Sequence, residues 1–263
     1  TGAGGGMADR LPVQLQQPHR VIRVGQDHAL ALAGGEVAGW KVGKIHPPVD
    51  GEERLTGPIF ADQVFAAGAE PLAMPVFAGG FAAAEAEFLL RIGTAPDPAK
   101  ASYTNAEARA LIDAVHVGIE IASSPYPGIN RDGPRVTVSD FGNNNGLIVG
   151  PEADGWRTHD LDAWPVTLAI NGERIGAATT ATMLDGPWGA ARYLFEHMAA
   201  RGIALRVGQW ISSGAVTGVH EVKPGDRVDG QFVSVGTEPR DHTGGDGRDV
   251  RVVPERFALV DVR

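Results

Sequence analysis

From Val37 onward the chain consists mostly of short apolar runs separated by glycine and proline, and this texture restricts its fold more than any other feature. Four examples within residues 39–93 are GWKVGK, GPIFADQVF, PVFAGGF and AEAEFLLRIG. Runs of about four to eight residues bounded by turn residues are typical of strands. Tight turns, in place of crossover helices, disfavour a doubly wound parallel sheet. We predict an α+β domain that is mostly β, with two helices among ten or more short strands.

The composition excludes several classes of function. The 263 residues are 43% hydrophobic, which is enough for one sizeable core. A net charge of −9 argues against a nucleic-acid partner, because binding a phosphate backbone needs a concentrated positive surface. The absence of cysteine excludes disulfides, thiolate nucleophiles and cysteine-bound metals. Any metal must therefore be bound by oxygen or imidazole ligands.

The chain is expected to have one main domain. We interpret residues 1–6 (TGAGGG) as a tag remnant, the poorly periodic residues 7–36 as an N-terminal arm or lid, and residues 37–263 as the domain itself. No apolar run approaches the roughly 18 residues of a membrane span, and no basic-then-apolar leader is present. We therefore expect a cytoplasmic protein without a membrane partner.

Local signals predict two helices and one hairpin. Thr104 and Glu107 have the spacing of a capping box, and helical periodicity continues to Val115, which predicts a helix of about a dozen residues. A second helix is predicted from Pro187, near its first turn, up to Gly202, which lies just past its end. The Asn-Gly pair within residues 166–180 predicts a β-hairpin.

Paired carboxylates are the most informative candidate for chemistry. Glu85 and Glu87 are two residues apart in a run expected to be a strand, so both side chains would project from the same face. Glu120, flanked by isoleucines with period two, would add a third carboxylate from another strand. Three such oxygen ligands suit Mg²⁺ or Mn²⁺. The spacing alone also allows both Glu85 and Glu87 to face water at a strand edge.

Seven short motifs in unbroken order resemble the 2-keto-4-pentenoate hydratase and 4-oxalocrotonate decarboxylase family, which belongs to the fumarylacetoacetate hydrolase-like superfamily. They cover about residues 36–236 and are Gly39–Gly43 (GWKVG), Ile59–Asp62 (IFAD), Glu85–Glu87 (EAE), Ile119–Ile121 (IEI), Asp140–Gly146 (DFGNNNG), Ser212–Ala215 (SSGA) and Pro224–Asp226 (PGD). The resemblance implies a mixed β-sandwich, roll or barrel like the C-terminal domain of fumarylacetoacetate hydrolase, with a few helices. The resemblance also implies that residues 37–263 form the catalytic domain.

The resemblance also implies a ligand set and several further site residues. Glu85, Glu87 and Glu120 would bind Mg²⁺ or Mn²⁺. The candidate catalytic residues are Lys41, Asp140 and Ser213, and the candidate substrate-binding residues are Phe60, Asp62, Asn144 and Ser212.

Some of these positions have a simpler structural interpretation. Asp140 and Asn144 could belong to an Asx-rich turn, and the two serines could simply end a strand.

Lys41 has an argument of its own. It lies between Trp40 and Val42, and glycines follow on both sides, so its surroundings are more apolar than a surface lysine requires. A lysine whose stem covers apolar surface while its ammonium stays in water would also fit. The resemblance places Lys41 in the active site, where it would pair with a substrate carboxylate or transfer a proton. Close to a metal ion, its pKa is expected to be lowered.

Three departures from the family pattern stand out. Ala83 occupies the place where the family often has an arginine, two residues before the first glutamate. The N-terminal region is expected to lack the family's long opening helix. Residues 240–249 (RDHTGGDGRD) form a polar insertion after the last shared motif. Substrate size is therefore expected to differ from that of the hydratases.

Taken together, the motifs indicate a metal-dependent hydratase of a small unsaturated 2-oxo or 2-hydroxydienoic acid, as in the catabolism of aromatic compounds. A 2-oxo acid decarboxylase or an acylpyruvate hydrolase on the same scaffold is the alternative, because an enolate is common to these reactions. A catalytically silent paralogue is a further alternative, which the Ala83 departure favours. We expect a homo-oligomer, because exposed strand edges commonly pair and the family is usually dimeric or larger.

Overall fold

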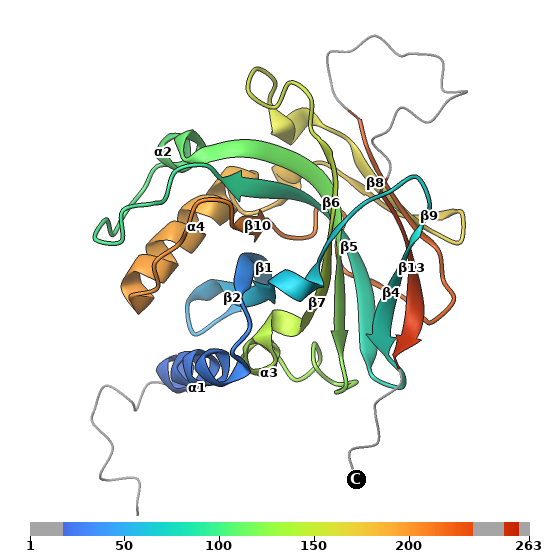
Figure 1. Cartoon of the computed structure of the whole chain (residues 1–263), viewed down its shortest axis with the longest axis horizontal. Coiled ribbons are helices and arrows are strands. Elements are labelled where there is room, and N and C mark those ends of the chain that lie inside the picture. The colour runs from blue at the N-terminus through green and yellow to red at the C-terminus, as the bar shows by residue number, and fades with distance from the viewer. Residues whose placement is uncertain (1–17, 234–249, 258–263) are drawn as a thin grey trace, which may run out of the picture.

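The structure is a computed structural model that describes residues 18–233 and 250–257, and this part of the chain forms two β-sheets and four α-helices (Figure 1). The first sheet contains, in spatial order, β2 (Glu52–Phe60), β1 (Val37–Val49), β10 (Trp210–Ser212), β5 (Phe81–Ile92), β6 (Ile112–Ser124), β7 (Asn144–Glu152) and β3 (Val64–Ala66), with β11 (His220–Glu221) paired to β5. The second contains β4 (Leu72–Phe77), β13 (Val250–Phe257), β12 (Val228–Phe232), β8 (Val166–Ile170) and β9 (Glu173–Ala178). The helices are α1 (Pro18–Ala33), α2 (Asn105–Ala110), α3 (Pro134–Ser139) and α4 (Gly186–Arg201).

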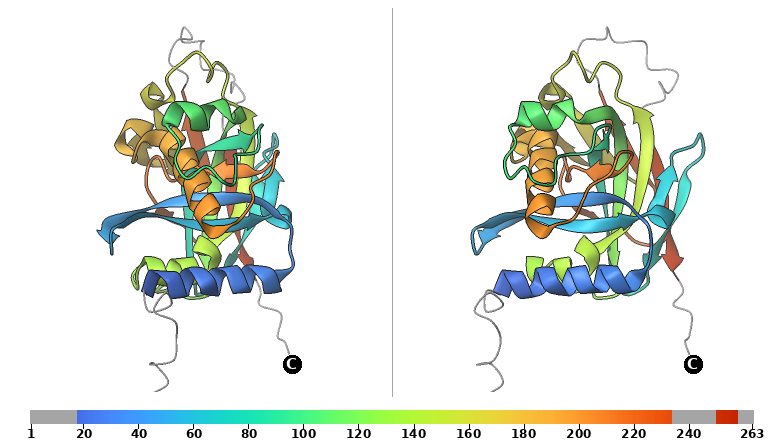
Figure 2. Two further views of the ribbon diagram at one scale, coloured as in Figure 1. Left: turned by 90° about the vertical axis from the view of Figure 1, so that its left-hand side faces the viewer. Right: turned by 60° about the vertical axis from the view of Figure 1, so that its left-hand side comes forward.

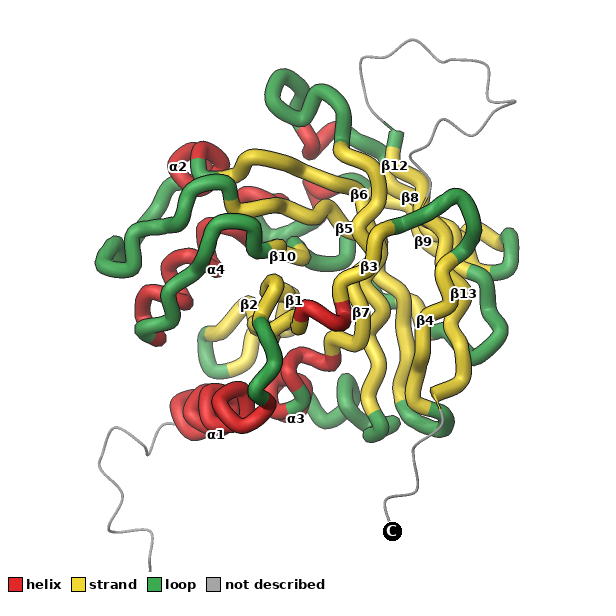
Figure 3. Tube along the Cα trace, viewed as in Figure 1, coloured by secondary structure: helices red, strands yellow, loops and turns green. Residues whose placement is uncertain are grey.

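Both sheets mix parallel and antiparallel pairs. Strands β1 and β10, β3 and β7, and β4 and β13 run parallel, whereas β5 pairs antiparallel with β6 and β10. The second sheet lies against β5, β6 and β7 of the first (Figure 3). In a different view, α1 lies beside α3 at one end of the molecule (Figure 2). The predicted α+β class with mostly β structure is confirmed.

Strand β5 is buried on both faces and lies at the centre of the core. One face carries Phe88, whose ring makes edge-to-face contacts with Trp164 at 5.9 Å and with Phe232 at 5.3 Å between centroids. The opposite face carries Leu89 in a separate apolar cluster and, further back along the strand, the two glutamates. The sequence of a strand that is buried on both faces is nearly all apolar, which explains the run AEAEFLLRI in β5. The polar residues within that run are therefore buried as well.

The predicted helix after Thr104 forms, but its predicted end is wrong. The capping box exists, with the Thr104 hydroxyl accepting from the Glu107 amide, yet α2 ends at Ala110. Strand β6 begins at Ile112 and includes Val115, which was expected to be helical. Pairing with β5 over the whole length of β6 outweighs a local periodicity that also fits alternating strand residues.

The other two local predictions are confirmed. Helix α4 has proline in its first turn and ends at Gly202, which has a left-handed φ of 70°. Strands β8 and β9 form the expected hairpin, with Asn171 at φ 54° and Gly172 at φ 81°. Positive φ at both turn residues is the conformation that an Asn-Gly hairpin requires.

The expectation that the chain lacks an opening helix is wrong, because α1 occupies Pro18–Ala33. Helix α1 lies in contact with α3. The Gln26 side chain is buried and donates to the Thr56 carbonyl at 3.0 Å. The expected polar insertion over residues 240–249 lies outside the described residues. Among the described helices, none has the length and apolar character that crossing a membrane requires.

Candidate metal centre

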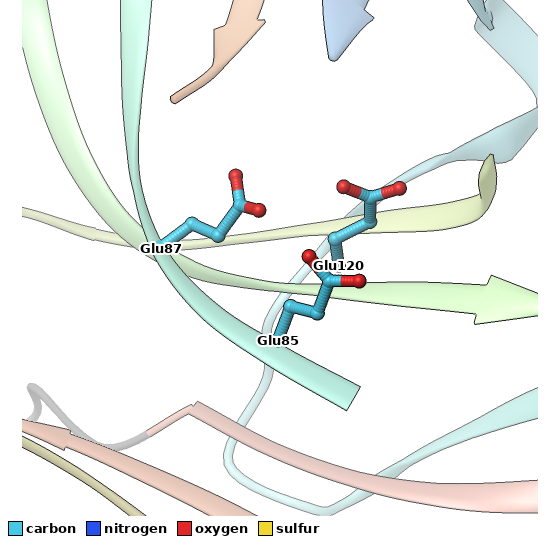
Figure 4. A group of neighbouring side chains, drawn as sticks. All are labelled: Glu85, Glu87 and Glu120. Atoms are coloured by element: carbon cyan, nitrogen blue, oxygen red, sulfur yellow. The ribbon is translucent and has the colours of Figure 1, made fainter. Parts of the chain in front are cut away.

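Pairing between β5 and β6 brings three glutamates together. Glu85 lies directly opposite Glu120 in the register, and Glu87 follows two residues later on the same face of β5. One carboxylate oxygen from each of the three lies within 4.8 Å of the others. Figure 4 shows the three carboxylates projecting from neighbouring strands to the same side of the sheet. Their exposed fractions are 7%, 1% and 0% for Glu85, Glu87 and Glu120, so they do not form a solvated strand edge.

The cluster carries more negative charge than its protein surroundings neutralise. The Lys41 ammonium lies 2.7 Å from Glu120 Oε1, which leaves two carboxylates without a matching cation in this cluster. Burial raises the pKa of Glu85 to about 7, with Lys41 opposing and the charge of Glu120 adding to the rise. Burial and the charges of Glu120 and Glu85 also raise the pKa of Glu87. A divalent cation would supply the missing charge.

Hydrogen bonds from three donors hold two of the carboxylates in place. The Ser212 hydroxyl donates to Glu87 Oε2 and, at 3.2 Å, to Glu120 Oε2. The Gly214 amide donates to Glu87 Oε2 at 3.0 Å, and the Asn144 amide donates to Glu120 Oε1 at 3.0 Å. Metal-binding carboxylates are typically oriented by such neighbours.

One oxygen of the cluster has no protein donor. Glu87 Oε1 is buried and finds no hydrogen-bond partner among the residues that the structure describes. A buried carboxylate oxygen without a donor is costly unless a ligand satisfies it. Oxygen ligands from carboxylates are those that Mg²⁺ and Mn²⁺ prefer. The residues present therefore fit a divalent cation.

The Lys41 side chain is buried, with an exposed fraction of 6%, and its ammonium also donates to Asn143 Oδ1 at 3.3 Å. Burial acts to lower the pKa of Lys41, but the charges of Glu120 and Glu85 outweigh it and raise the pKa above its usual range. This direction is opposite to the one expected from the sequence. A cation among the carboxylates would offset their attraction for the ammonium, so the expected lowering applies to the metal-bound protein.

Two cavities adjoin the cluster, and both are large enough for a small organic acid. The first, the central cavity, has a volume of about 410 Å³ and is lined by Lys41, Glu85 and Asn143, among others. The second, the basic cavity, has a volume of about 330 Å³ and is lined by Ser213, Gly214, Lys44 and Arg54, together with small and apolar residues. Ser213 and Gly214 directly follow Ser212, so the basic cavity begins beside the glutamates.

Comparisons with known proteins agree with this architecture. The structure of 4-oxalocrotonate decarboxylase from Pseudomonas putida G7 with magnesium and adipate has a TM-score of 0.71 at 19% identity, covering 92% of this chain and 86% of that one. Fumarylpyruvate hydrolase from Pseudomonas aeruginosa, with Mn²⁺ and pyruvate, has a TM-score of 0.57 at 18% identity, covering 83% and 89%. The chain has the fumarylacetoacetate hydrolase-like fold. The fold that the resemblance of the sequence motifs implied is thereby confirmed.

The similarity of this chain to curated proteins in sequence is low and covers only part of the chain. The chain is 27% identical to 4-oxalocrotonate decarboxylase from Pseudomonas putida over 128 residues, which is 49% of this chain and 48% of that protein. The match thus spans about half the length of this curated relative. None of the known protein-family models matches the chain.

The structure brings most, though not all, of the sequence-predicted site residues to the cluster. Lys41, Ser212 and Asn144 contact the glutamates, whereas Ser213 follows Ser212 in sequence and lines the basic cavity. Three other candidates do not line the central cavity, and they are Asp140, Phe60 and Asp62. Asp140 terminates α3, Phe60 packs its ring against Phe141 at 5.6 Å, and Asp62 is exposed in the short turn Ala61–Gln63.

Sequence reasoning selected Asn144 but did not single out its neighbour Asn143. Asn143 has a left-handed φ of 55°, which turns its side chain to the Lys41 ammonium. The preceding Gly142 also has positive φ, and a Cβ there would lie 2.9 Å from the Lys41 side chain. The Gly-Asn pair was a usable signal, because these residues adopt left-handed backbone most readily.

The surroundings of Ala83 show why this position, where the family often has an arginine, suits an alanine in this chain. Ala83 lies on the Glu85 face of β5, is fully buried and packs with Phe81, Ala122 and Ile129. An arginine would have to displace this apolar cluster. In this chain the central cavity is instead lined by Arg131, from the loop before α3.

Proposed function

We propose that the protein is a divalent-metal-dependent lyase that acts on a small 2-oxo acid. In the reaction, water is added to, or removed from, a carbon–carbon double bond conjugated with the ketone. The observation that carries the proposal is the buried cluster of Glu85, Glu87 and Glu120, whose excess negative charge matches Mg²⁺ or Mn²⁺. A structural role for three buried, mutually repelling carboxylates would only destabilise the fold.

A cation bound there would polarise the 2-keto oxygen of the substrate and stabilise the negative charge that develops on it. Lys41 opens onto the central cavity beside Glu85, so its ammonium would bind the substrate 1-carboxylate or deliver a proton. Ser213 lines the basic cavity, and its proposed role is to orient substrate or water there; its buried Oγ has no hydrogen-bond partner within the described ranges. Ser212 and Asn144 would act indirectly by holding the glutamates.

Decarboxylation is the second candidate, and the named relatives favour it. The curated protein that matches half of the chain is a 4-oxalocrotonate decarboxylase. Decarboxylation and hydration both need negative charge to be stabilised on the same keto oxygen, so the cluster serves either reaction. Hydrolysis of an acylpyruvate needs the same stabilisation, and one structural neighbour is a fumarylpyruvate hydrolase.

The reaction is tested by offering both substrates with Mg²⁺. Hydration of 2-hydroxypenta-2,4-dienoate removes its conjugated absorbance without releasing CO₂, whereas decarboxylation of 4-oxalocrotonate releases CO₂. We expect turnover that a chelator abolishes and added Mg²⁺ or Mn²⁺ restores. Turnover that survives exhaustive chelation would rule out the metal-dependent mechanism, and CO₂ release alone would replace the hydratase by the decarboxylase.

The metal centre is tested separately from activity. Glu87→Gln keeps the size of the side chain but removes its charge, and we expect Mn²⁺ affinity measured by calorimetry to fall more than about 100-fold. The matched control is Glu70→Gln, because Glu70 is exposed and outside the cluster. Equal Mn²⁺ affinity in wild type and both variants would contradict the proposed ligand set.

A further inference from the structure

Three consecutive residues beside the metal centre have left-handed backbone. Phe141, Gly142 and Asn143 have φ angles of 50°, 75° and 55°, and two of the three are not glycine. Left-handed backbone costs free energy in residues that carry a Cβ, so such a run persists only where the surrounding structure holds it. Its result is that the Asn143 side chain reaches the Lys41 ammonium.

Two close backbone approaches hold this turn in place. A Cβ on Gly57 would lie 1.9 Å from the Phe141 carbonyl oxygen, so the turn lies directly on the backbone of β2. A Cβ on Gly142 would lie 2.9 Å from the Lys41 side chain. Because glycine has no Cβ, both approaches are possible in this chain. The two glycines thus seat the turn on β2 and beside the stem of Lys41.

Neighbouring asparagines hold the two members of one buried ion pair. Asn143 Oδ1 accepts from the Lys41 ammonium at 3.3 Å, and the Asn144 amide donates to Glu120 Oε1 at 3.0 Å. The Lys41 ammonium and Glu120 Oε1 lie 2.7 Å apart. The Asn143 amide nitrogen donates to Asn130 Oδ1 at 3.2 Å, which fixes the amide so that its oxygen faces Lys41.

The Lys41 ammonium has two acceptors in the described part of the chain, and a metal ion would affect them differently. Glu120 belongs to the candidate metal ligands, whereas Asn143 is neutral and is not one of the three glutamates. A cation bound by Glu120 would offset the attraction of that carboxylate for the ammonium. A buried ammonium without an acceptor is costly, and Asn143 is the acceptor that remains.

We propose that Asn143 is the positioning residue for Lys41, and that its amide oxygen holds the ammonium at the wall of the central cavity when Glu120 binds the metal ion. The site can then keep the ammonium and the metal ion close together. Lys41, Asn143 and Asn130 all line the central cavity, so the ammonium stays where a substrate would bind. This inference rests on the proposed function, because it needs a cation at the glutamates.

A double-mutant cycle on Mn²⁺ affinity tests whether Asn143 acts through Lys41. Asn143→Gly removes the acceptor and tolerates the left-handed backbone, and Lys41→Met removes the ammonium. We expect calorimetry to show about tenfold weaker Mn²⁺ binding in Asn143→Gly than in the wild type, because a hydrogen bond to a charged group is lost. In the Lys41→Met background, the same substitution changes the affinity by less than about twofold. The control Asn145→Ala removes an amide that donates to the Pro75 carbonyl, and it leaves the affinity unchanged.

Asn143→Asp provides a second test, which decides the question even if Lys41→Met does not fold. An ionised aspartate keeps an acceptor oxygen and tolerates left-handed backbone, but it cannot donate to Asn130. We expect its Mn²⁺ affinity to equal or exceed that of the wild type. An affinity reduced as in Asn143→Gly would mean that the bond to Asn130 matters and the acceptor does not, and this would overturn the assignment.

Two outcomes of the cycle would also overturn the role of Asn143. One is unchanged Mn²⁺ affinity in Asn143→Gly, and the other is an equal loss in both Lys41 backgrounds, which a purely structural role would produce. If the wild type binds Mn²⁺ and the cycle shows no coupling, only the inference about Asn143 fails. If the wild type binds no Mn²⁺, the metal centre and the inference drawn from it fail together.

Discussion

At the residue scale, a single hydroxyl connects two of the three buried carboxylates. Ser212 is fully buried and donates to both Glu87 and Glu120, although the two residues come from different strands. A serine proton can occupy only one of these hydrogen bonds at a time, so the two acceptors share it. This arrangement holds one oxygen of each carboxylate close to the Ser212 hydroxyl and so orients both groups.

We expect Ser212→Ala to weaken Mn²⁺ binding by about tenfold, because residues that orient metal ligands typically contribute about 10- to 100-fold to affinity. Calorimetry on chelator-treated protein measures the effect. Ser139→Ala is the matched control, because Ser139 is exposed and its hydroxyl donates to the nearby Val136 carbonyl. A Ser212→Ala protein with unchanged affinity would show that the glutamates are held by their strands alone.

At the element scale, the site depends on the register between β5 and β6. These strands pair over most of their length, and the pairing places Glu85 opposite Glu120. A slip of β5 by one residue would turn Glu85 and Glu87 to the opposite face of the strand, where Trp164 and Phe232 pack. Burial of both faces thus specifies the register, and the register assembles the carboxylates.

Helix α4 offers a separate test of local structure. Gly202 ends the helix at φ 70°, and a Cβ there would meet no atom within 4 Å, so only backbone conformation opposes substitution. We expect Gly202→Ala to lower the free energy of unfolding by about 1 kcal/mol, as measured by urea denaturation. Gly202→Asn should cost less, because asparagine tolerates left-handed backbone. Equal losses in the two variants would mean that backbone conformation is not the cause.

At the scale of the whole molecule, the acidic cluster links stability to pH and to metal. The pKa of Glu85 in the folded protein, about 7, exceeds its ordinary value of 4.5, so folding favours the protonated form. The associated stabilisation is complete below about pH 4.5 and is lost as pH rises through about 7. A divalent cation replaces the proton and restores stability where the carboxylates are ionised.

We therefore expect the melting temperature of the chelator-treated protein to fall between about pH 5 and about pH 8. Added Mg²⁺ should raise it more at the higher pH, because the ion competes with protons for the same oxygens. Differential scanning calorimetry checks both effects. The Glu85→Gln, Glu87→Gln double variant should lose most of the pH dependence and the Mg²⁺ effect. An equal response to Mg²⁺ in the double variant would place the ion elsewhere.

The sequence by itself determined the features that depend on a few neighbouring residues. The Asn-Gly hairpin, the glycine at the end of α4 and the shared face of Glu85 and Glu87 all follow from local backbone geometry, and the structure contains each of them. Period-two spacing also placed Glu120 on a strand face, and the family motifs then linked Glu120 and Lys41 to this pair.

Only the tertiary structure decided where distant segments meet. Residues around Val115 were expected to be helical, but strand pairing makes them part of β6. The left-handed backbone at Asn143 directs its side chain to Lys41, so Asn143 joins Asn144 at the site. The register of β1 with β2 set Lys44 opposite Arg54. These outcomes depend on hydrogen bonding and burial summed over a whole sheet, and no short window of sequence contains that sum.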